Sequence, residues 1–337
     1  MQPDISDGSC IYLRQRYCVN LDQRIGSGAS CDVFGGTDQT TTAAIAVKQI
    51  EDVLYNRRVA KCYLREAMIS MHMTHPNTVS IYDATFQSCL DGSVQLYMIM
   101  EKIDRTLRHI IRSPTFATLT IRKIKYLMFQ ALHGLKYMHG CQLAHRDIKP
   151  ANMLVDPHTW ELKLCDYGLS ANLADEKSLK TAVVTRNYRS PELLLESRSY
   201  DTAIDMWALG CSFAELFSGK VLFPGEDCGD QLRLMVDMLG VPEEAQLPAD
   251  PSEEGQQLLQ EALAAARPGS APLRTQLPAE RLPEGALSLL EGLLQWDPAR
   301  RLSAADALAH PFFRDASQLF STQAQDCAPA PRVFHYS

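Results

Sequence analysis

The sequence lacks any excess of positive charge. Its 33 Lys and Arg residues are outnumbered by 40 Asp and Glu residues, which gives a formal net charge of −7, and no basic tract offsets this balance. Proteins that bind nucleic acid carry basic patches or stripes. We therefore expect no nucleic-acid partner.

Paired cysteines are also lacking. The chain has 10 Cys, but they are scattered and none forms a C-x-x-C pair. This pattern argues against a structural zinc site and against a disulfide framework. It favours reduced thiols, as expected for a cytoplasmic protein, with the nucleus as the second compartment.

Long apolar runs are absent as well. No run is long enough to span a bilayer, and the N-terminus lacks the basic and then apolar profile of a signal peptide. The last residues, Phe-His-Tyr-Ser, contain no prenylation box. We expect no membrane partner, and a length of 337 residues allows one large two-lobed domain or two ordinary ones.

One stretch combines several chemically active side chains: His145-Arg-Asp-Ile-Lys-Pro-Ala-Asn152. It contains a carboxylate that can act as a base, a cation and an amide that can bind a metal. A second short stretch, Asp166-Tyr-Gly168, follows the apolar run from Leu162 to Cys165. The pair is typical of a catalytic loop and a metal-binding loop for phosphoryl transfer.

Upstream of these loops lies a Gly-rich stretch between strand-like segments, Gly26-Ser-Gly28-Ala-Ser-Cys31-Asp-Val33. Such a loop can cover nucleotide phosphates with its backbone N–H groups, although a plain hairpin turn is the default interpretation. The apolar strand Ala44–Val47 then ends on Lys48. This Lys is either a phosphate ligand or an ordinary edge charge.

A helix is predicted from Val59 to Met71 by apolar spacings of three and four. Glu66 falls on its apolar side, with Tyr63 and Ser70, and is our candidate partner for Lys48; the alternative is an ordinary helix salt bridge. Apolar patterns also predict strands at 79–83 and 95–100, and helices at 121–139, 256–265 and within 286–313. The pair Asp91-Gly92 predicts a turn between the two strands.

Taken in this order, residues from about 20 to 314 resemble a eukaryotic protein kinase of the group that contains cyclin-dependent and MAP kinases. Arg189 in Tyr-Arg-Ser-Pro-Glu192 marks that group, and the stretches Gly134–His139, Leu222–Gly225 and Ala307–Pro311 look most like MAP kinases. The resemblance implies an α+β, bilobal fold with a small β-rich N-lobe, one main helix in it, and a larger helical C-lobe.

The domain boundaries follow from this resemblance. They are an N-terminal arm at 1–16, a kinase domain at 17–314 and a C-terminal tail at 315–337. Within the domain, the N-lobe covers about 17–101 and the C-lobe about 104–314, with a MAP-kinase-like insert at about 240–283.

The resemblance also implies residue roles in ATP- and Mg²⁺-dependent phosphorylation of Ser or Thr in protein substrates, favouring Ser-Pro and Thr-Pro sites. Asp147 would be the base, Lys149 would steady the transferred phosphate, and Glu66 would position Lys48. Asn152 and Asp166 would hold Mg²⁺. The residues around the nucleotide would be Ile25, Gly26, Gly28, Val33, Ala46, Lys48, Met100, Glu101, Ile103, Asn152, Leu154, Cys165 and Asp166. Thr185 would pair with Lys149, Glu192 with Arg301, and Asp205 would orient the catalytic loop.

The departures from MAP kinases concern regulation. Lys180 and Ala182 stand where a doubly phosphorylated Thr-x-Tyr pair is expected, which leaves Ser178 and Thr181 as candidate phosphosites. Asn172 replaces one of three phosphate-gathering arginines, of which Arg65 and Arg146 remain. Thr106 replaces an Asp that binds the ATP ribose. The acidic docking patch is reduced to Asp315.

Three hypotheses remain open. The first is an active serine/threonine kinase, since all six central residues of the motif set are present. The second is a catalytically silent scaffold. The third is a kinase activated by a regulatory protein partner. Cys31 and Cys165 are either redox or covalent-ligand sites near the nucleotide, or inert thiols.

Overall fold

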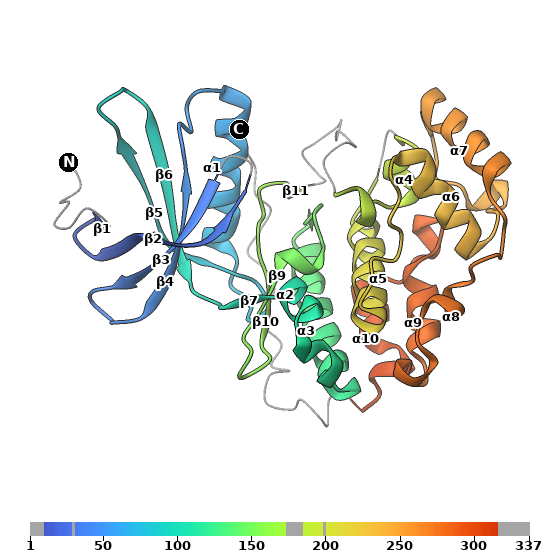
Figure 1. Ribbon diagram of the computed structural model, residues 1–337. Coiled ribbons are helices and arrows are strands. Elements are labelled where there is room, and N and C mark those ends of the chain that lie inside the picture. Colours follow the sequence, from blue (N-terminus) through green and yellow to red (C-terminus); the bar gives the residue numbers. More distant parts are fainter. Residues whose placement is uncertain (1–9, 29–30, 173–184, 198–199, 316–337) are drawn as a thin grey trace. The chain divides into compact units, whose positions relative to one another are not determined.

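The computed structural model describes residues 10–28, 31–172, 185–197 and 200–315 (Figure 1). These residues form two compact units. The first contains the chain up to Asp104 together with Asp166–Gly168, and the second contains Arg105–Cys165 and the chain from Leu169 onward. A β-rich unit and a larger helical unit confirm the predicted α+β kinase fold.

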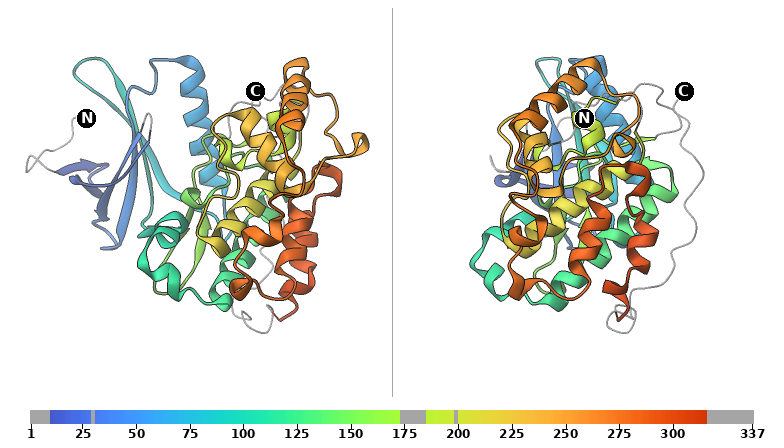
Figure 2. Two further views of the ribbon diagram at one scale, coloured as in Figure 1. Left: turned by 45° about the vertical axis from the view of Figure 1, so that its right-hand side comes forward. Right: turned by 90° about the vertical axis from the view of Figure 1, so that its right-hand side faces the viewer.

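The first unit is built on a six-stranded antiparallel sheet in the order β1-β2-β3-β4-β6-β5. Helix α1 lies along one face of this sheet (Figures 1 and 2). The elements are β1 (Cys10–Leu13), β2 (Tyr17–Ser27), β3 (Cys31–Asp38), β4 (Ala44–Ile50), α1 (Arg57–His72), β5 (Ile81–Ser88) and β6 (Val94–Glu101).

Strand β1 differs from the expectation of an arm at 1–16, because its residues pair with Tyr17–Asn20 of β2. The hairpin turn uses Arg14 and Gln15, both with left-handed φ angles, 51° and 56°. Arg14 then reaches β5, where it pairs with Asp83 at 3.0 Å and donates to the Ala84 carbonyl at 2.9 Å. These contacts hold the hairpin in the sheet.

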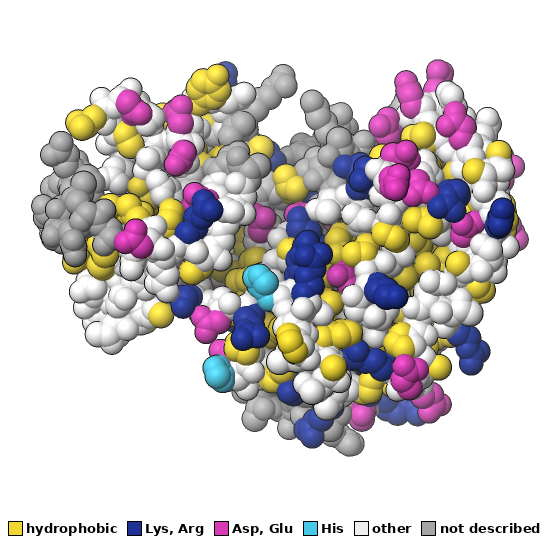
Figure 3. Space-filling model, viewed as in Figure 1, with side chains coloured by type: hydrophobic (Ala, Val, Ile, Leu, Met, Phe, Trp, Pro, Cys, Tyr) yellow, Lys and Arg dark blue, Asp and Glu magenta, His cyan; other side chains and the backbone are white. Residues whose placement is uncertain are grey.

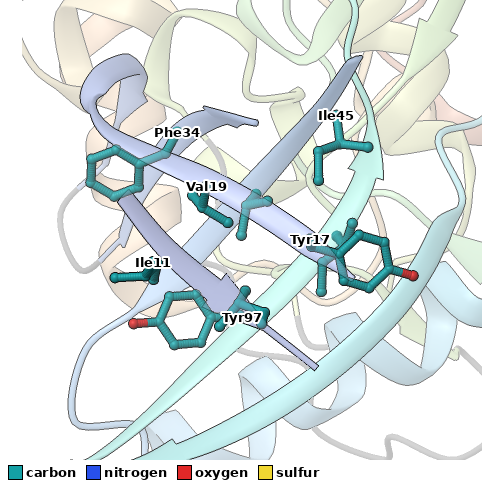
Figure 4. Packing of buried hydrophobic residues seen from close by; sticks show 9 residues of the cluster. Ile11, Tyr17, Val19, Phe34, Ile45 and Tyr97 are labelled. Carbon is teal, nitrogen blue, oxygen red and sulfur yellow. The ribbon is translucent and has the colours of Figure 1, made fainter. Parts of the chain in front are cut away.

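Central strand β4 is apolar except for Lys48 and Gln49, because both of its faces are covered. Ile45 and Val47 belong to a core cluster with Tyr17 and Tyr97 on one face (Figure 4). Ile50 belongs to a second cluster on the other face, to which α1 contributes Ala67. Side chains alternate along a strand, so Lys48 falls on the face that α1 covers.

The second unit is organised around α5 (Ala203–Ser218), in which every residue from Ile204 to Phe217 is buried. Helix α3 (Ile121–Gly140) contacts both α5 and α10 (Ala304–Ala309). The other helices are α2 (Leu107–Arg112), α4 (Pro191–Leu194), α6 (Cys228–Leu239), α7 (Glu253–Ala265), α8 (Leu273–Gln276) and α9 (Ala286–Leu293). Two small sheets, β10-β9-β7 and β11-β8, comprise β7 (Arg105–Thr106), β8 (Leu143–Ala144), β9 (Met153–Val155), β10 (Leu162–Leu164) and β11 (Ala171–Asn172).

The segment at 240–283, which we predicted to be an insert, packs through α7 against α6. Ser252 caps α7 by accepting a hydrogen bond from the Gly255 N–H at 2.9 Å, and its own N–H donates to the Leu195 carbonyl at 3.0 Å. At Gly255 a Cβ would lie only 2.1 Å from that carbonyl oxygen. The insert therefore meets the rest of the unit at a contact with no room for a side chain.

Candidate active site

The loop from His145 to Asn152 is positioned by a buried carboxylate on α5. Asp205 accepts hydrogen bonds from the backbone N–H groups of His145 and Arg146, both at 2.8 Å, and contacts His139 Nε2 at 3.0 Å. Burial disfavours the Asp205 charge, but these hydrogen bonds and the imidazole of His139 outweigh it and lower the pKa of Asp205. The same bonds hold Arg146 at a left-handed φ of 69°, a conformation that persists only where the surroundings enforce it.

Asp147 lies at the centre of a hydrogen-bond network within the second unit. Its Oδ2 accepts from Lys149 Nζ at 2.6 Å and from Asn152 Nδ2 at 2.8 Å, and its Oδ1 accepts from Thr185 Oγ1 at 2.9 Å. Lys149 Nζ also donates to Thr185 Oγ1 at 2.8 Å. Three predicted side chains, from two separate stretches of sequence, thus meet at one carboxylate.

His145 supports this network through contacts between its ring and the backbone. It is fully buried, its Nε2 lies 3.1 Å from the Cys165 carbonyl, and its Nδ1 accepts from the Asp147 N–H at 3.3 Å. These contacts use both ring nitrogens in the architecture of the loop. His145 is therefore part of the scaffold of the loop.

In the first unit, Lys48 and Glu66 form the predicted ion pair, with 2.5 Å between Nζ and Oε1. Asp166 is the second anion, 3.3 Å from the same nitrogen. Burial opposes the Lys48 charge, but the carboxylates of Glu66 and Asp166 outweigh this effect and raise the pKa of Lys48. Lys48 is therefore a firmly held cation.

The backbone of the Asp166 segment is shaped for this contact. Asp166 has a left-handed φ of 68°, and a Cβ on Gly168 would lie 3.2 Å from Glu66 Oε2. That distance is tighter than most Cβ contacts, so glycine allows the close approach to Glu66. Within the described residues, Glu66 Oε2 has no hydrogen-bond partner.

The other predicted nucleotide residues divide between the two units. Ile25, Gly26, Gly28, Val33, Ala46, Met100, Glu101 and Ile103 belong to the first unit, and Asn152, Leu154 and Cys165 belong to the second. In the first unit, Gly26 pairs with Val33, and Ala46 pairs with Met100 across the sheet. In the second, the Cys165 N–H donates to the Asn152 carbonyl at 3.0 Å.

The predicted metal ligands have chemistry that suits Mg²⁺, which prefers carboxylate and amide oxygens. The side chain of Asp166 is 47% exposed, so its carboxylate is accessible to a cation. Asn152 uses its amide nitrogen for Asp147, which leaves Oδ1 as the atom it can offer to a metal. Within the described ranges, no cluster of three or more His, Cys, Asp or Glu side chains could hold a metal by itself.

Two predicted regulatory positions have local partners instead. Thr106, expected at the ribose position, caps α2 by accepting from the His109 N–H at 3.2 Å. Asp315, the expected docking acid, pairs with Lys125 at 2.7 Å, which lowers the pKa of Asp315. Lys125 and Asp315 line a pocket of about 640 Å³ together with Glu284, Arg314 and Phe312. Lys180, Ala182, Ser178 and Thr181 lie outside the described residues.

Sequence reasoning missed two features of the site. His139 is the last basic residue of an apolar helix, and nothing in the local pattern indicated its contact with Asp205. The bond from the Thr185 hydroxyl to Asp147 joins residues that are 38 positions apart. The kinase resemblance had paired Thr185 with Lys149 only.

The glutamate after Pro191 has the predicted partner. Arg301 Nη1 and Nη2 donate to the two carboxylate oxygens of Glu192 at 2.8 Å and 3.1 Å, and both side chains are buried.

In the part of the chain that the structure describes, no helix has the length and apolar character needed to cross a bilayer.

Comparisons with known proteins agree with this geometry. A family model described as a protein kinase domain matches residues 19–313. Mitogen-activated protein kinase 4a of Physcomitrium patens is 38% identical over 288 residues, which cover 86% of this chain and 75% of that protein. Mitogen-activated protein kinase 13 of Arabidopsis thaliana is 33% identical over 329 residues, which cover 98% of this chain and 87% of that protein. The chain therefore belongs to the protein kinase family, as a serine/threonine kinase related to the MAP kinases.

Proposed function

We propose that this kinase transfers the γ-phosphate of Mg·ATP to Ser or Thr hydroxyls that precede Pro in protein substrates. The observation that carries the proposal is the network at Asp147, in which a carboxylate is held between Lys149, Asn152 and Thr185. Such an arrangement suits phosphoryl transfer because that reaction needs positioning and charge neutralisation more than covalent catalysis.

In the proposed reaction, Asp147 accepts the proton of the substrate hydroxyl as its oxygen bonds to the γ-phosphorus and the bond to the β-phosphate oxygen breaks. Lys149 neutralises charge that develops on the transferred group. Lys48, held by Glu66, binds the nucleotide phosphates. Asn152 and Asp166 would hold Mg²⁺, which would supply charge neutralisation at the phosphates.

The preference for Pro rests on Arg189. In the related kinases this position marks the proline-directed group, and here the Arg189 guanidinium lies 3.7 Å from Cys228 Sγ at the start of α6. We also propose that the protein works in the cytoplasm or nucleus, for which the unpaired pattern of cysteines in the sequence is the support.

The test is γ-phosphate transfer from Mg·ATP to a protein substrate with a Ser-Pro or Thr-Pro site. Unphosphorylated recombinant protein is compared with Asp166→Ala as the blank. We expect turnover above the blank, and loss of most of it when the Pro is replaced by Ala. Asp147→Asn should lower kcat by about 10²–10⁴-fold while ATP binding survives.

Each other outcome removes one part of the proposal. Unchanged turnover in Asp147→Asn would exclude this residue as the base. Equal rates on the Pro and Ala substrates would exclude proline direction. A chain that binds no nucleotide and transfers no phosphate would be a scaffold rather than an enzyme.

A further inference from the structure

Two arginines stand one turn apart on α2, the short helix next to the catalytic loop. Arg108 and Arg112 are four residues apart and both are exposed, and residues at this spacing share one face of a helix. The same helix contacts Pro150–Asn152, at the end of the loop that carries Asp147. The two guanidinium groups therefore lie on the surface in the same part of the second unit as the proposed base.

A buried carboxylate on α5 shows what these arginines face. Glu215 is 6% exposed, and its Oε2 accepts a hydrogen bond from the Tyr188 hydroxyl at 2.7 Å. Burial raises the pKa of Glu215, and the Tyr188 hydrogen bond and the positive charges of Arg108 and Arg112 oppose this shift. Both arginines are therefore close enough to Glu215 for their charges to act on it.

This cluster of Arg108, Arg112 and Glu215 has a surplus of positive charge. Among the described residues, neither guanidinium has a hydrogen-bond or ion-pair partner. With the Glu215 carboxylate ionised, two cations face one anion, so a single positive charge remains at the surface. A guanidinium pairs well with a carboxylate because its N–H groups match the two oxygens. The cluster is thus complementary to one carboxylate of a bound molecule.

The short segment from Thr185 to Arg189 connects the cluster to the site of transfer. Thr185 binds the proposed base, and Tyr188 bonds to Glu215 beside the arginines. Arg189 instead contacts Cys228 at the start of α6. Helices α2 and α6 lie on either side of α5 (Figure 1). A substrate whose Pro lies at Arg189 therefore has the residues before its target hydroxyl on the side of α2.

We propose that Arg108 and Arg112 select protein substrates with an Asp or Glu residue a short distance before the phosphorylated Ser or Thr. This inference rests on the proposed function, whose substrate class it narrows to acidic proline-directed sites. A carboxylate is favoured over the dianion of a phosphoserine because the cluster has a single positive charge in excess. The two arginines contact the substrate away from the reacting atoms, so they determine specificity and are not catalytic.

The test compares peptides that differ from one another in one residue. Each contains a Thr-Pro site, and Glu replaces Ala in turn at each position before the Thr. An extended chain advances about 3.3 Å per residue, so few of these positions can reach the arginines. We expect kcat/KM to rise roughly 3–10-fold at those positions and to stay the same where Glu follows the Pro.

Neutral substitutions measure the contribution of each arginine. Arg108→Gln and Arg112→Gln should each lower the preference for Glu over Ala about 2–5-fold, and the double variant should abolish it. The rate on the Ala peptide is the internal reference and should be unchanged, because these side chains do not touch the reacting groups. Lys136→Gln, at an exposed position on α3, is the matched control and should leave both rates at their wild-type values.

Charge reversal makes the test specific. Arg108→Glu combined with Arg112→Glu should favour a peptide with Lys at the best position over one with Glu there. Added salt should reduce the preference of the wild type, since screening weakens exposed charge pairs. A wild type with equal kcat/KM for the Glu, Ala and Lys peptides would overturn the proposal, and so would a preference that survives in the double Gln variant.

Two further outcomes would assign the arginines to another anion. A preference for phosphoserine at the best position, with none for Glu, would replace the carboxylate with a phosphate. A preference for Glu that emerges only in the double variant Asp175→Asn/Glu176→Gln would assign the arginines to that segment of the chain itself. Either result would overturn the proposed occupant.

A binding measurement separates this inference from the proposed function. Fluorescence anisotropy gives the Kd of the Glu and Ala peptides for the Asp147→Asn protein, in which transfer is blocked. We expect the Glu peptide to bind roughly 3–10-fold more tightly, and both peptides to bind equally once Arg108→Gln and Arg112→Gln are added. Arginine-dependent binding without any transfer in the wild type would keep the recognition site but contradict the proposed function. Transfer without an acidic preference would do the reverse.

Discussion

At the scale of single residues, the Thr185 hydroxyl makes two hydrogen bonds within the site. It donates to Asp147 Oδ1 and accepts from Lys149 Nζ, so it ties the proposed base to the proposed phosphate cation. Its removal would leave each charged partner with one fewer hydrogen bond. This oxygen atom therefore helps to orient both side chains.

Thr185→Val keeps the shape of the side chain and removes the hydroxyl. We expect kcat to fall by about 10–100-fold, with a smaller change in the KM for ATP, because the interaction orients Asp147 and not the nucleotide. Thr185→Ser restores the oxygen and should recover most of the rate. Steady-state kinetics of the two variants check this, and an equally impaired Ser variant would point to packing instead.

Tyr97 gives a second prediction at this scale, through pH. Burial raises the pKa of Tyr97 to about 12, against about 10 in an unfolded chain. Below pH 10 both states keep the proton. Between pH 10 and 12 the unfolded state loses it first, so the free energy of unfolding falls as the pH rises.

Tyr97→Phe removes the titrating hydroxyl. The stability of wild type relative to this variant should therefore fall by about 1 kcal/mol between pH 9 and pH 11. Urea denaturation of both proteins at the two pH values measures this difference. A constant difference across this range would show that Tyr97 titrates alike in both states.

At the scale of elements, the Glu192–Arg301 pair connects the start of α4 with the loop before α10. Arg301 also donates to the carbonyls of Ala203 at 2.7 Å and Gln295 at 3.0 Å. The pair is buried, so the loss of one member leaves an uncompensated charge.

We expect Glu192→Gln to lower the free energy of unfolding by about 3–5 kcal/mol. Arg301→Met should cost more, because it also removes the bonds to the two carbonyls. The double variant Glu192→Leu/Arg301→Met should be more stable than the Arg301 single variant with Glu192 intact. Urea denaturation measures all of these, and costs that simply add would argue that the two side chains do not interact.

The elements that the sequence predicted well are the ones with strong periodicity, such as the helix at 121–139, which the structure places at Ile121–Gly140. Strand β1 escaped prediction because it is only four residues long and its turn at Arg14 and Gln15 lacks the Gly or Asn that marks a hairpin. Helix α7 begins at Glu253, three residues before the predicted Gln256, because Ser252 caps it.

The active-site residues were accessible from sequence because each motif is local, whereas their contacts are not. The spacing within His145–Asn152 indicates which side chains are present in the loop. It does not by itself indicate that Asp205, 60 positions from His145, holds the loop backbone; that role was predicted only from the kinase resemblance. Such long-range hydrogen bonds depend on how the helices pack, which no short stretch of sequence specifies.

At the scale of the whole molecule, the sequence departs from the MAP-kinase pattern at positions expected to serve regulation. Acidic side chains gather over α6 and α7 of the second unit (Figure 3), whereas the first turns of α1 in the first unit carry Arg57 and Lys61 and the first turn has no acidic residue. The position of the expected activating phosphate carries Lys180 instead. We infer that activity does not depend on phosphorylation at that position.

Lys180→Ala in unphosphorylated protein tests this inference. If the Lys replaces an activating group by its own charge, the transfer rate should fall several-fold, while Lys180→Arg keeps the charge and the rate. Mass spectrometry verifies that the samples carry no phosphate. An Ala variant with the wild-type rate would show that this side chain has no activating role.

The contact at Gly255 has a consequence for how this chain can change during evolution. Because a Cβ would collide with the Leu195 carbonyl, natural variants of this kinase are expected to keep glycine there. The exposed neighbours Glu254 and Gln256 can drift freely, since their side chains reach solvent. An insert that varies in length and composition would thus retain one invariant position, and orthologous sequences would show it as a fixed column between variable ones.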